Sequence, residues 1–134
     1  MLQAHCVNLS VLDLDAVSRW YENTLNFTRV SRTAYPEMGL EIAFLRQGEF
    51  EIELISFAGS VREADHPDPP KHARVRGITH FAFRVADIDE MINELTRKEV
   101  PVLWGPKTYD EHRMKVIFVR DPEGNLVKFV ERLA

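Results

Sequence analysis

The chain carries the same residue pattern twice, and this repetition restricts the possible folds more than any other feature of the sequence. Residues 6–15 (CVNLSVLDLD) are matched by residues 80–89 (HFAFRVADID), at an offset of 80 − 6 = 74 positions. Near the end of each half, a glycine turn leads into an apolar strand pattern, in residues 48–57 and again in residues 124–131. We therefore expect two copies of one supersecondary unit.

Each half predicts a strand, a helix and then three strands. Apolar and polar residues alternate over residues 7–11, which is the period of a half-buried strand. Asp13 is placed to cap a helix that follows, and Asp87 has the same place in the second half. The remaining strands are predicted at residues 27–33, 40–46 and 49–57, and at residues 100–103, 114–120 and 125–131.

The predicted fold class is α+β. One helix covers only one face of its sheet, so a single βαβββ module cannot bury its sheet alone. We therefore expect two tandem βαβββ modules, paired into a curved, partly open mixed sheet around a cleft. The single domain spans residues 1–134, with module one at 1–57, a connector at 58–76 and module two at 77–134. The proline-rich connector is predicted to be a loop, and its His66 and His72 are predicted to be solvated, with a lid over the cleft as the less favoured alternative.

Strand alternation selects the side chains that face this cleft, since neighbouring residues of a strand point to opposite faces. The corresponding positions of the two halves are Cys6 with His80, and Glu53 with Lys128, and we expect these four at the cleft floor. The other predicted cleft residues are Asn8, Ser10, Ile55, Phe57, Arg84, Trp104 and Leu126. The sequence leaves open whether His112 or Arg113 also reaches the cleft.

Composition excludes several classes of function. There are 17 Lys and Arg residues against 21 Asp and Glu, a formal charge of −4, which is unsuited to a general nucleic-acid binder. No apolar run approaches the roughly 20 residues that span a membrane, and the first residues lack the pattern of a signal peptide. Cys6 is the single cysteine and cannot form an internal disulfide. A cytoplasmic protein with a small-molecule ligand is therefore expected.

Several motifs together resemble the vicinal oxygen chelate superfamily, the group of glyoxalase I, bleomycin-resistance proteins, extradiol dioxygenases and methylmalonyl-CoA epimerase. They are residues 11–15 (VLDLD), 20–27 (WYENTLNF), 77–89 (GITHFAFRVADID) and 121–127 (DPEGNLV). The resemblance covers nearly the whole chain. It implies binding of a small organic molecule, and assembly as a homodimer.

The resemblance also implies metal ligands at positions 6, 53, 80 and 128, and here the chain departs from the family. Lys128 offers a divalent ion no lone pair while it is protonated, and its charge repels the ion. No cofactor is therefore expected. If Zn, Ni, Mn or Fe does bind, the ligands are Cys6, Glu53 and His80.

A reading without metal gives the same residues other roles. Lys128 and Glu53 would form an ion pair beside His80, and Lys128 would hold a substrate carboxylate or a developing enolate. Glu53 or His80 would accept the proton. A structural ion pair without chemistry is the alternative.

Three functions follow from the resemblance. The first is a lyase or isomerase, similar to glyoxalase I or an epimerase, that transfers a proton next to a carbonyl. The second is a non-catalytic binding or sequestration protein of the bleomycin-resistance type. An extradiol-type dioxygenase ranks last, because it requires an open iron site.

Overall fold

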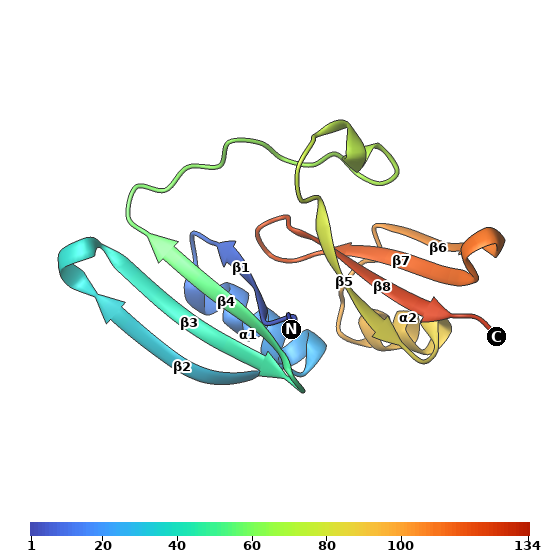
Figure 1. Cartoon of the computed structure of the whole chain (residues 1–134), viewed down its shortest axis with the longest axis horizontal. Helices are drawn as coiled ribbons and strands as arrows, with labels where there is room; N and C mark the ends of the chain where they lie inside the picture. The colour runs from blue at the N-terminus through green and yellow to red at the C-terminus, as the bar shows by residue number, and fades with distance from the viewer. The chain divides into compact units, whose positions relative to one another are not determined.

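The computed structural model describes all 134 residues, and its internal contacts divide the chain into two compact units (Figure 1). The first unit is Met1–Arg62 and the second is Glu63–Ala134. The division falls inside the predicted connector, so that most of the connector, residues 63–76, belongs to the second unit. No helix of the chain combines the length and the apolar character that crossing a membrane requires.

The first unit is one helix on a four-stranded sheet. Its elements are β1 (Cys6–Ser10), α1 (Leu14–Leu25), β2 (Thr28–Tyr35), the 3₁₀ helix η1 (Pro36–Met38), β3 (Leu40–Gln47) and β4 (Phe50–Phe57). The strand order is β1-β4-β3-β2, with β1 parallel to β4 and the other pairs antiparallel. Helix α1 contacts β2, β3 and β4 and lies behind the sheet in Figure 1.

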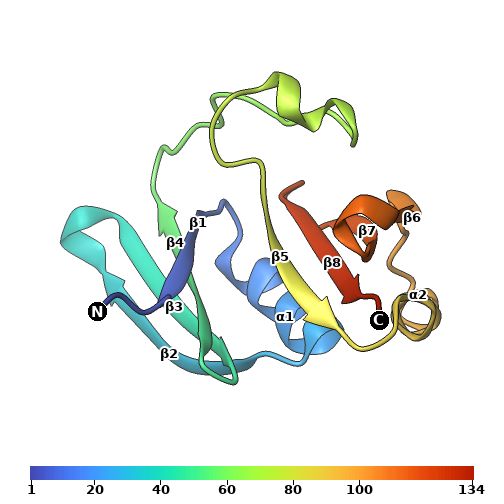
Figure 2. The ribbon, with the colours of Figure 1, turned by 45° about the vertical axis from the view of Figure 1, so that its right-hand side comes forward.

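The second unit repeats this arrangement. Its elements are the 3₁₀ helix η2 (Lys71–Arg74), β5 (His80–Val85), α2 (Ile88–Arg97), β6 (Trp104–Tyr109), the 3₁₀ helix η3 (Asp110–His112), β7 (Met114–Arg120) and β8 (Leu126–Arg132). The strand order is β5-β8-β7-β6, with β5 parallel to β8. Helix α2 contacts β7 and β8, and Figure 2 shows it nearly end-on beside this sheet. The α+β fold with two βαβββ modules is thus confirmed.

Both helices begin where the sequence predicts. The carboxylate Oδ1 of Asp13 accepts a hydrogen bond from the backbone N–H of Ala16 at 3.0 Å, and Oδ1 of Asp87 accepts one from Glu90 at the same distance. Each bond satisfies a backbone donor that the first turn of a helix leaves without a partner. The apolar helix faces are buried against the sheets, together with the inward residues of β3, β4, β7 and β8. Each unit thus has its own apolar core, which explains why the apolar pattern of the sequence occurs once in each half.

The sheet registers show how closely the two units correspond. Glu53 lies between Asn8 and Phe44 on its neighbouring strands, and Lys128 lies between Ala82 and Phe118. The offset is 118 − 44 = 74 for the phenylalanines and 128 − 53 = 75 for the charged residues. The second unit therefore has one extra residue in the turn between β7 and β8.

Buried Asp121 organises that turn. Its Oδ1 accepts hydrogen bonds from the backbone N–H groups of Glu123 at 3.0 Å and Asn125 at 2.9 Å, and its Oδ2 accepts one from the Asn125 amide. A buried polar group requires hydrogen-bond partners, and these three bonds supply them. The longer turn thus has its own internal support.

The sixth strand differs from the prediction. Residues 100–103 are not a strand, and β6 begins only at Trp104. The backbone N–H of Val100 closes the end of α2 by donating to Leu95, and Pro101 has no N–H to donate. The actual strand contains Gly105 and Pro106, where its register with β7 shifts. Such residues are tolerated because β6 is an edge strand.

Candidate functional site

One face of the second sheet carries a row of side chains from all four of its strands. Ala82, Lys128, Phe118 and Trp104 lie opposite one another in register on β5, β8, β7 and β6. His80 lies two residues before Ala82, and therefore on the same face. Strand alternation brings these side chains together, as the sequence predicts for His80 and Lys128.

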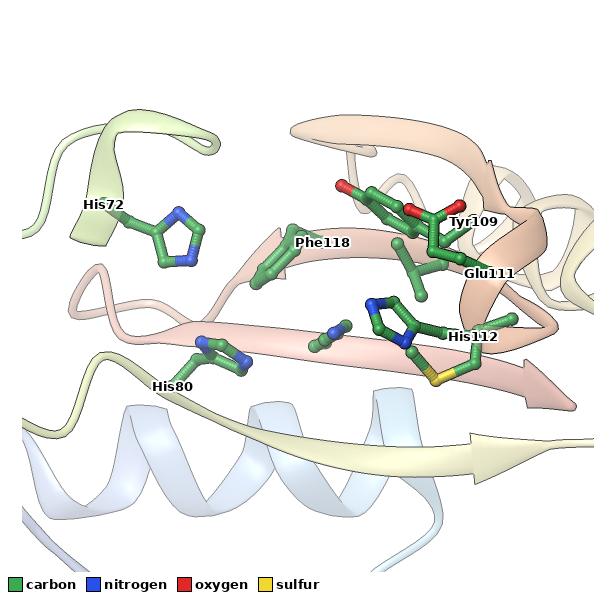
Figure 3. A pocket seen from close by; sticks show the side chains of 9 residues that line it. His72, His80, Tyr109, Glu111, His112 and Phe118 are labelled. Carbon is green, nitrogen blue, oxygen red and sulfur yellow. The ribbon is translucent and has the colours of Figure 1, made fainter.

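Two histidine rings lie close to the ring of Phe118 in this site, as Figure 3 shows. The ring of Phe118 lies 5.0 Å from the ring of His80 and 5.3 Å from the ring of His72, and the two histidine rings are 5.5 Å apart. Trp104 also contacts Phe118, with ring centres 6.0 Å apart. The Nζ atom of Lys128 lies 5.8 Å above the Phe118 ring, within the range of a cation–π contact.

These side chains line a cavity of about 260 Å³. Its walls come from η2, β5, the last residue of β6, η3, β7 and β8. The lining residues are His72, His80, Tyr109, Glu111, His112, Met114, Val116, Phe118 and Lys128. Figure 3 shows His72 and His80 at one end and Tyr109, Glu111 and His112 at the other. A small apolar molecule with one polar end matches this lining.

Two basic groups of the cavity, His80 and Lys128, have lowered pKa values. Burial, and then the nearby charge of Lys128, lower the pKa of His80 from 6.5 to about 4. Burial also lowers the pKa of the Lys128 amine from its usual value. At pH 7 the site therefore contains a neutral imidazole next to an amine whose charged form is disfavoured by burial.

His72 reaches the cavity because the connector folds back onto the second sheet. The Arg120 guanidinium donates to the backbone oxygens of His66 and Gly124 at 2.9 and 2.7 Å, and to a carboxylate oxygen of Asp68 at 2.8 Å. These bonds hold the segment that leads into η2. The prediction that His66 and His72 are solvated was therefore wrong, since both are half-buried and a ring nitrogen of each is buried without a hydrogen bond.

Comparison with known proteins identifies the family. Residues 3–129 match the family described as the Glyoxalase/Bleomycin resistance protein/Dioxygenase superfamily. The chain belongs to this superfamily. The resemblance noted in the sequence motifs is thereby confirmed over nearly the whole chain.

Distant relatives within the superfamily include named enzymes. The chain is 26% identical to the mitochondrial methylmalonyl-CoA epimerase of Bos taurus over 84% of its own length, and spans 63% of the length of that relative. It is 27% identical to the uncharacterised protein YwkD of Bacillus subtilis, over 78% of this chain and 80% of YwkD.

Solved structures show the same fold. A glyoxalase family protein from Enterococcus faecalis superposes with a TM-score of 0.79 at 23% identity, over 96% of this chain and 97% of that one. A glyoxalase I mutant from Zea mays superposes with a TM-score of 0.75 at 22% identity, over 96% of this chain and 45% of that one. At this level of identity the likeness concerns the fold alone.

Of the cleft residues predicted in the second unit, some line the cavity and others do not. His80 and Lys128 line the cavity, whereas Trp104 does not line it but packs against Phe118, which does. Leu126 is only 2% exposed and Arg84 is exposed, and neither lines the cavity. His112 lines the cavity and Arg113 does not, which answers the question that the sequence left open.

The predicted residues of the first unit lie on β1 and β4. Cys6, Asn8 and Ser10 are exposed, and Glu53 and Ile55 are half-buried on the strand paired with them. Phe57 is half exposed at the end of β4. The predicted pairing of Glu53 with Lys128, and of Cys6 with His80, stays a prediction.

Many members of the superfamily hold a divalent metal, and the donor groups of the second unit do not by themselves fit one. Within either unit, no three His, Cys, Asp or Glu side chains are grouped as a metal ion requires. In the second unit the residue beside His80 is Lys128, whose ammonium form has no lone pair. The three-ligand set of Cys6, Glu53 and His80 draws on both units and stays a prediction. No step proposed below involves a metal.

Proposed function

We propose that the protein binds a small organic molecule with an apolar body and one carboxylate or carbonyl end in the cavity of its second unit. The supporting observation is the chemistry of that cavity. Lys128 and the neutral His80 are the polar groups proposed to meet that end, and Phe118, Val116 and Met114 supply apolar walls. The remaining polar side chains of the lining are His72, Tyr109, Glu111 and His112. A volume of about 260 Å³ lies just below the roughly 300–1,000 Å³ typical of drug-sized ligands, so the ligand part held here is small.

In this proposal the Lys128 ammonium takes the electrostatic role that a metal ion has in many relatives. A positive charge that is held next to Phe118 and partly removed from water attracts an anionic oxygen more strongly than an exposed lysine does. The same charge stabilises an enolate that forms when a proton leaves the carbon next to a carbonyl. The neutral His80 and the carboxylate of Glu53 are the proposed proton acceptors.

Proton transfer next to a carbonyl is thus the proposed reaction, which makes the protein a lyase or isomerase. Its distant similarity to methylmalonyl-CoA epimerase makes acyl-CoA thioesters the first compounds to test. The thiohemiacetal of methylglyoxal and glutathione is the second, because the sequence resembles that of glyoxalase I.

The test is the exchange of the α-hydrogen for deuterium in heavy water, followed by NMR or mass spectrometry with and without chelator. We expect exchange that survives the chelator and is lost in Glu53→Gln or Lys128→Met. A matched control is Glu51→Gln, since Glu51 lies on the same face of β4 and is paired with Arg46 at 2.6 Å. Exchange that requires added metal would contradict the proposed role of Lys128.

Sequestration without chemistry is the second candidate, and the lysine at a family ligand position favours it. A binding protein of the bleomycin-resistance type needs only the cavity and its charge. Tight binding of a ligand with neither exchange nor turnover would support this alternative over the enzyme.

A further inference from the structure

The Lys128 side chain combines features that make an amine chemically reactive and not only attractive to anions. It provides the single primary amine among the residues that line the cavity. Its Nζ atom makes no ion pair or hydrogen bond with a residue of its own unit, and its one described contact there is with the face of Phe118. An amine in such a place is free to reorient towards a bound molecule.

We propose that Lys128 condenses reversibly with small aldehydes that carry an apolar or aromatic body, and forms an imine with them in the cavity. The proposal rests on the proposed function only in placing the ligand in the same cavity. It goes further by naming a covalent step and a class of ligand.

The condensation needs no oxidant, reductant or further reactant. The lone pair of neutral Nζ attacks the carbonyl carbon, and the π electrons of the C=O bond move to the oxygen, which takes up a proton. The resulting carbinolamine loses its hydroxyl group with a second proton as water while the nitrogen lone pair forms the C=N bond. The two hydrogens of the amine thus balance those of the released water.

The surroundings favour each part of this step. The rings of Phe118, His72 and Tyr109 offer flat surfaces to an aromatic aldehyde, and the cavity volume limits its size. The neutral His80 adds no second positive charge beside the amine. Burial of the amine also favours its neutral, nucleophilic form over the charged one. Once formed, a protonated imine keeps the positive charge of the site.

The test traps the imine in the intact protein. The protein is incubated with benzaldehyde and sodium cyanoborohydride, which reduces the imine to a stable benzyl amine, and each modified lysine is then located and quantified by peptide mass spectrometry. We expect Lys128 to be modified about tenfold or more faster than the exposed Lys71 in the same molecule. Because Lys71 is an internal reference, this comparison needs no variant and no refolding.

Two variants and one competitor complete the design. Lys128→Arg keeps the charge but cannot form an imine, so the fast modification disappears. Lys107→Arg removes the other lysine near the cavity, whose Nζ lies 5.9 Å from the Tyr109 ring, and leaves the modification of Lys128 unchanged. Benzoate, which cannot condense, slows the trapping at Lys128 by competition.

The outcomes separate the two proposals. If Lys128 is trapped no faster than Lys71 while benzoate binds the wild type more tightly than Lys128→Met, the imine proposal is wrong and the proposed ligand cavity stands. If Lys128 is not trapped and benzoate does not bind, both proposals are wrong. Fast trapping in wild type that persists in the presence of saturating benzoate would overturn the placement of the reaction in this cavity.

Discussion

The burial of His80 makes a quantitative prediction about stability. The pKa of this histidine falls from 6.5 to about 4 in the folded protein, because burial and then Lys128 disfavour the charged ring. One pKa unit corresponds to about 1.36 kcal/mol. The difference of 2.5 between these two pKa values therefore corresponds to at most about 3.4 kcal/mol in the free energy of unfolding. His80 is only half-buried, so solvent screening reduces the expected contribution to about 1–2 kcal/mol.

The sign follows from which state binds the proton. The unfolded chain takes up a proton on this histidine at about pH 6.5, whereas the folded protein resists until about pH 4. The contribution to stability is therefore complete above pH 6.5 and is lost progressively as the pH falls towards 4. Replacing His80 with a side chain that does not titrate removes this part of the acid sensitivity.

The assay compares wild type and His80→Asn by urea unfolding between pH 7 and about pH 4. Trp104 packs on Phe118, so its fluorescence in a Trp20→Phe background reports on the second unit. We expect the wild type to lose about 1–2 kcal/mol more than His80→Asn over this range. His5→Asn is the matched control, because His5 is exposed and its replacement is expected to change nothing. Equal pH dependence in wild type and His80→Asn would refute the desolvation of His80.

Three further predictions concern the same unit. Lys128→Met raises the pKa of His80 in an NMR titration but leaves it below 6.5, because burial is the larger cause of the shift; an unchanged value would contradict the coupling. Arg120→Ala frees the segment that leads into η2, so that the backbone N–H of Lys71, which donates to Asp68 at 3.0 Å, exchanges faster with heavy water than in an Arg132→Ala control. Asp121→Ala lowers the free energy of unfolding by about 2–4 kcal/mol, because the backbone N–H groups of Glu123 and Asn125 lose their acceptor. A loss below about 1 kcal/mol would show that the turn does not depend on this carboxylate.

Local sequence signals were sufficient for most of the fold. The two capping aspartates and the alternating strands are short-range patterns, and the internal repeat ties the two halves to one topology. The edge strand β6 was missed because Gly105 and Pro106 contradict strand propensity, and only its pairing with β7 makes it a strand. Propensity is a weak guide where tertiary pairing decides the structure.

The site was predictable only in part, for a similar reason. His80 and Lys128 follow from strand parity, which is a property of neighbouring residues. The position of His72 depends on the hydrogen bonds that Arg120 makes with His66 and Asp68, which are 54 and 52 residues away in the chain, and no periodicity reports such contacts. The sequence around Arg120 does not indicate that its side chain binds the proline-rich connector.

Binding of benzoate in the presence of a chelator tests the central claim most directly, because the claim is that Lys128 supplies the positive charge of the site. Calorimetric titration of wild type, Lys128→Arg and Lys128→Met would measure the affinity for an apolar anion that cannot condense. We expect binding that does not depend on metal, is largely kept in Lys128→Arg and is at least about tenfold weaker in Lys128→Met, in line with a charge-assisted contact of about 1.5–3 kcal/mol. Binding that is unchanged in Lys128→Met, or that disappears with the chelator and returns with Zn²⁺, would contradict the account.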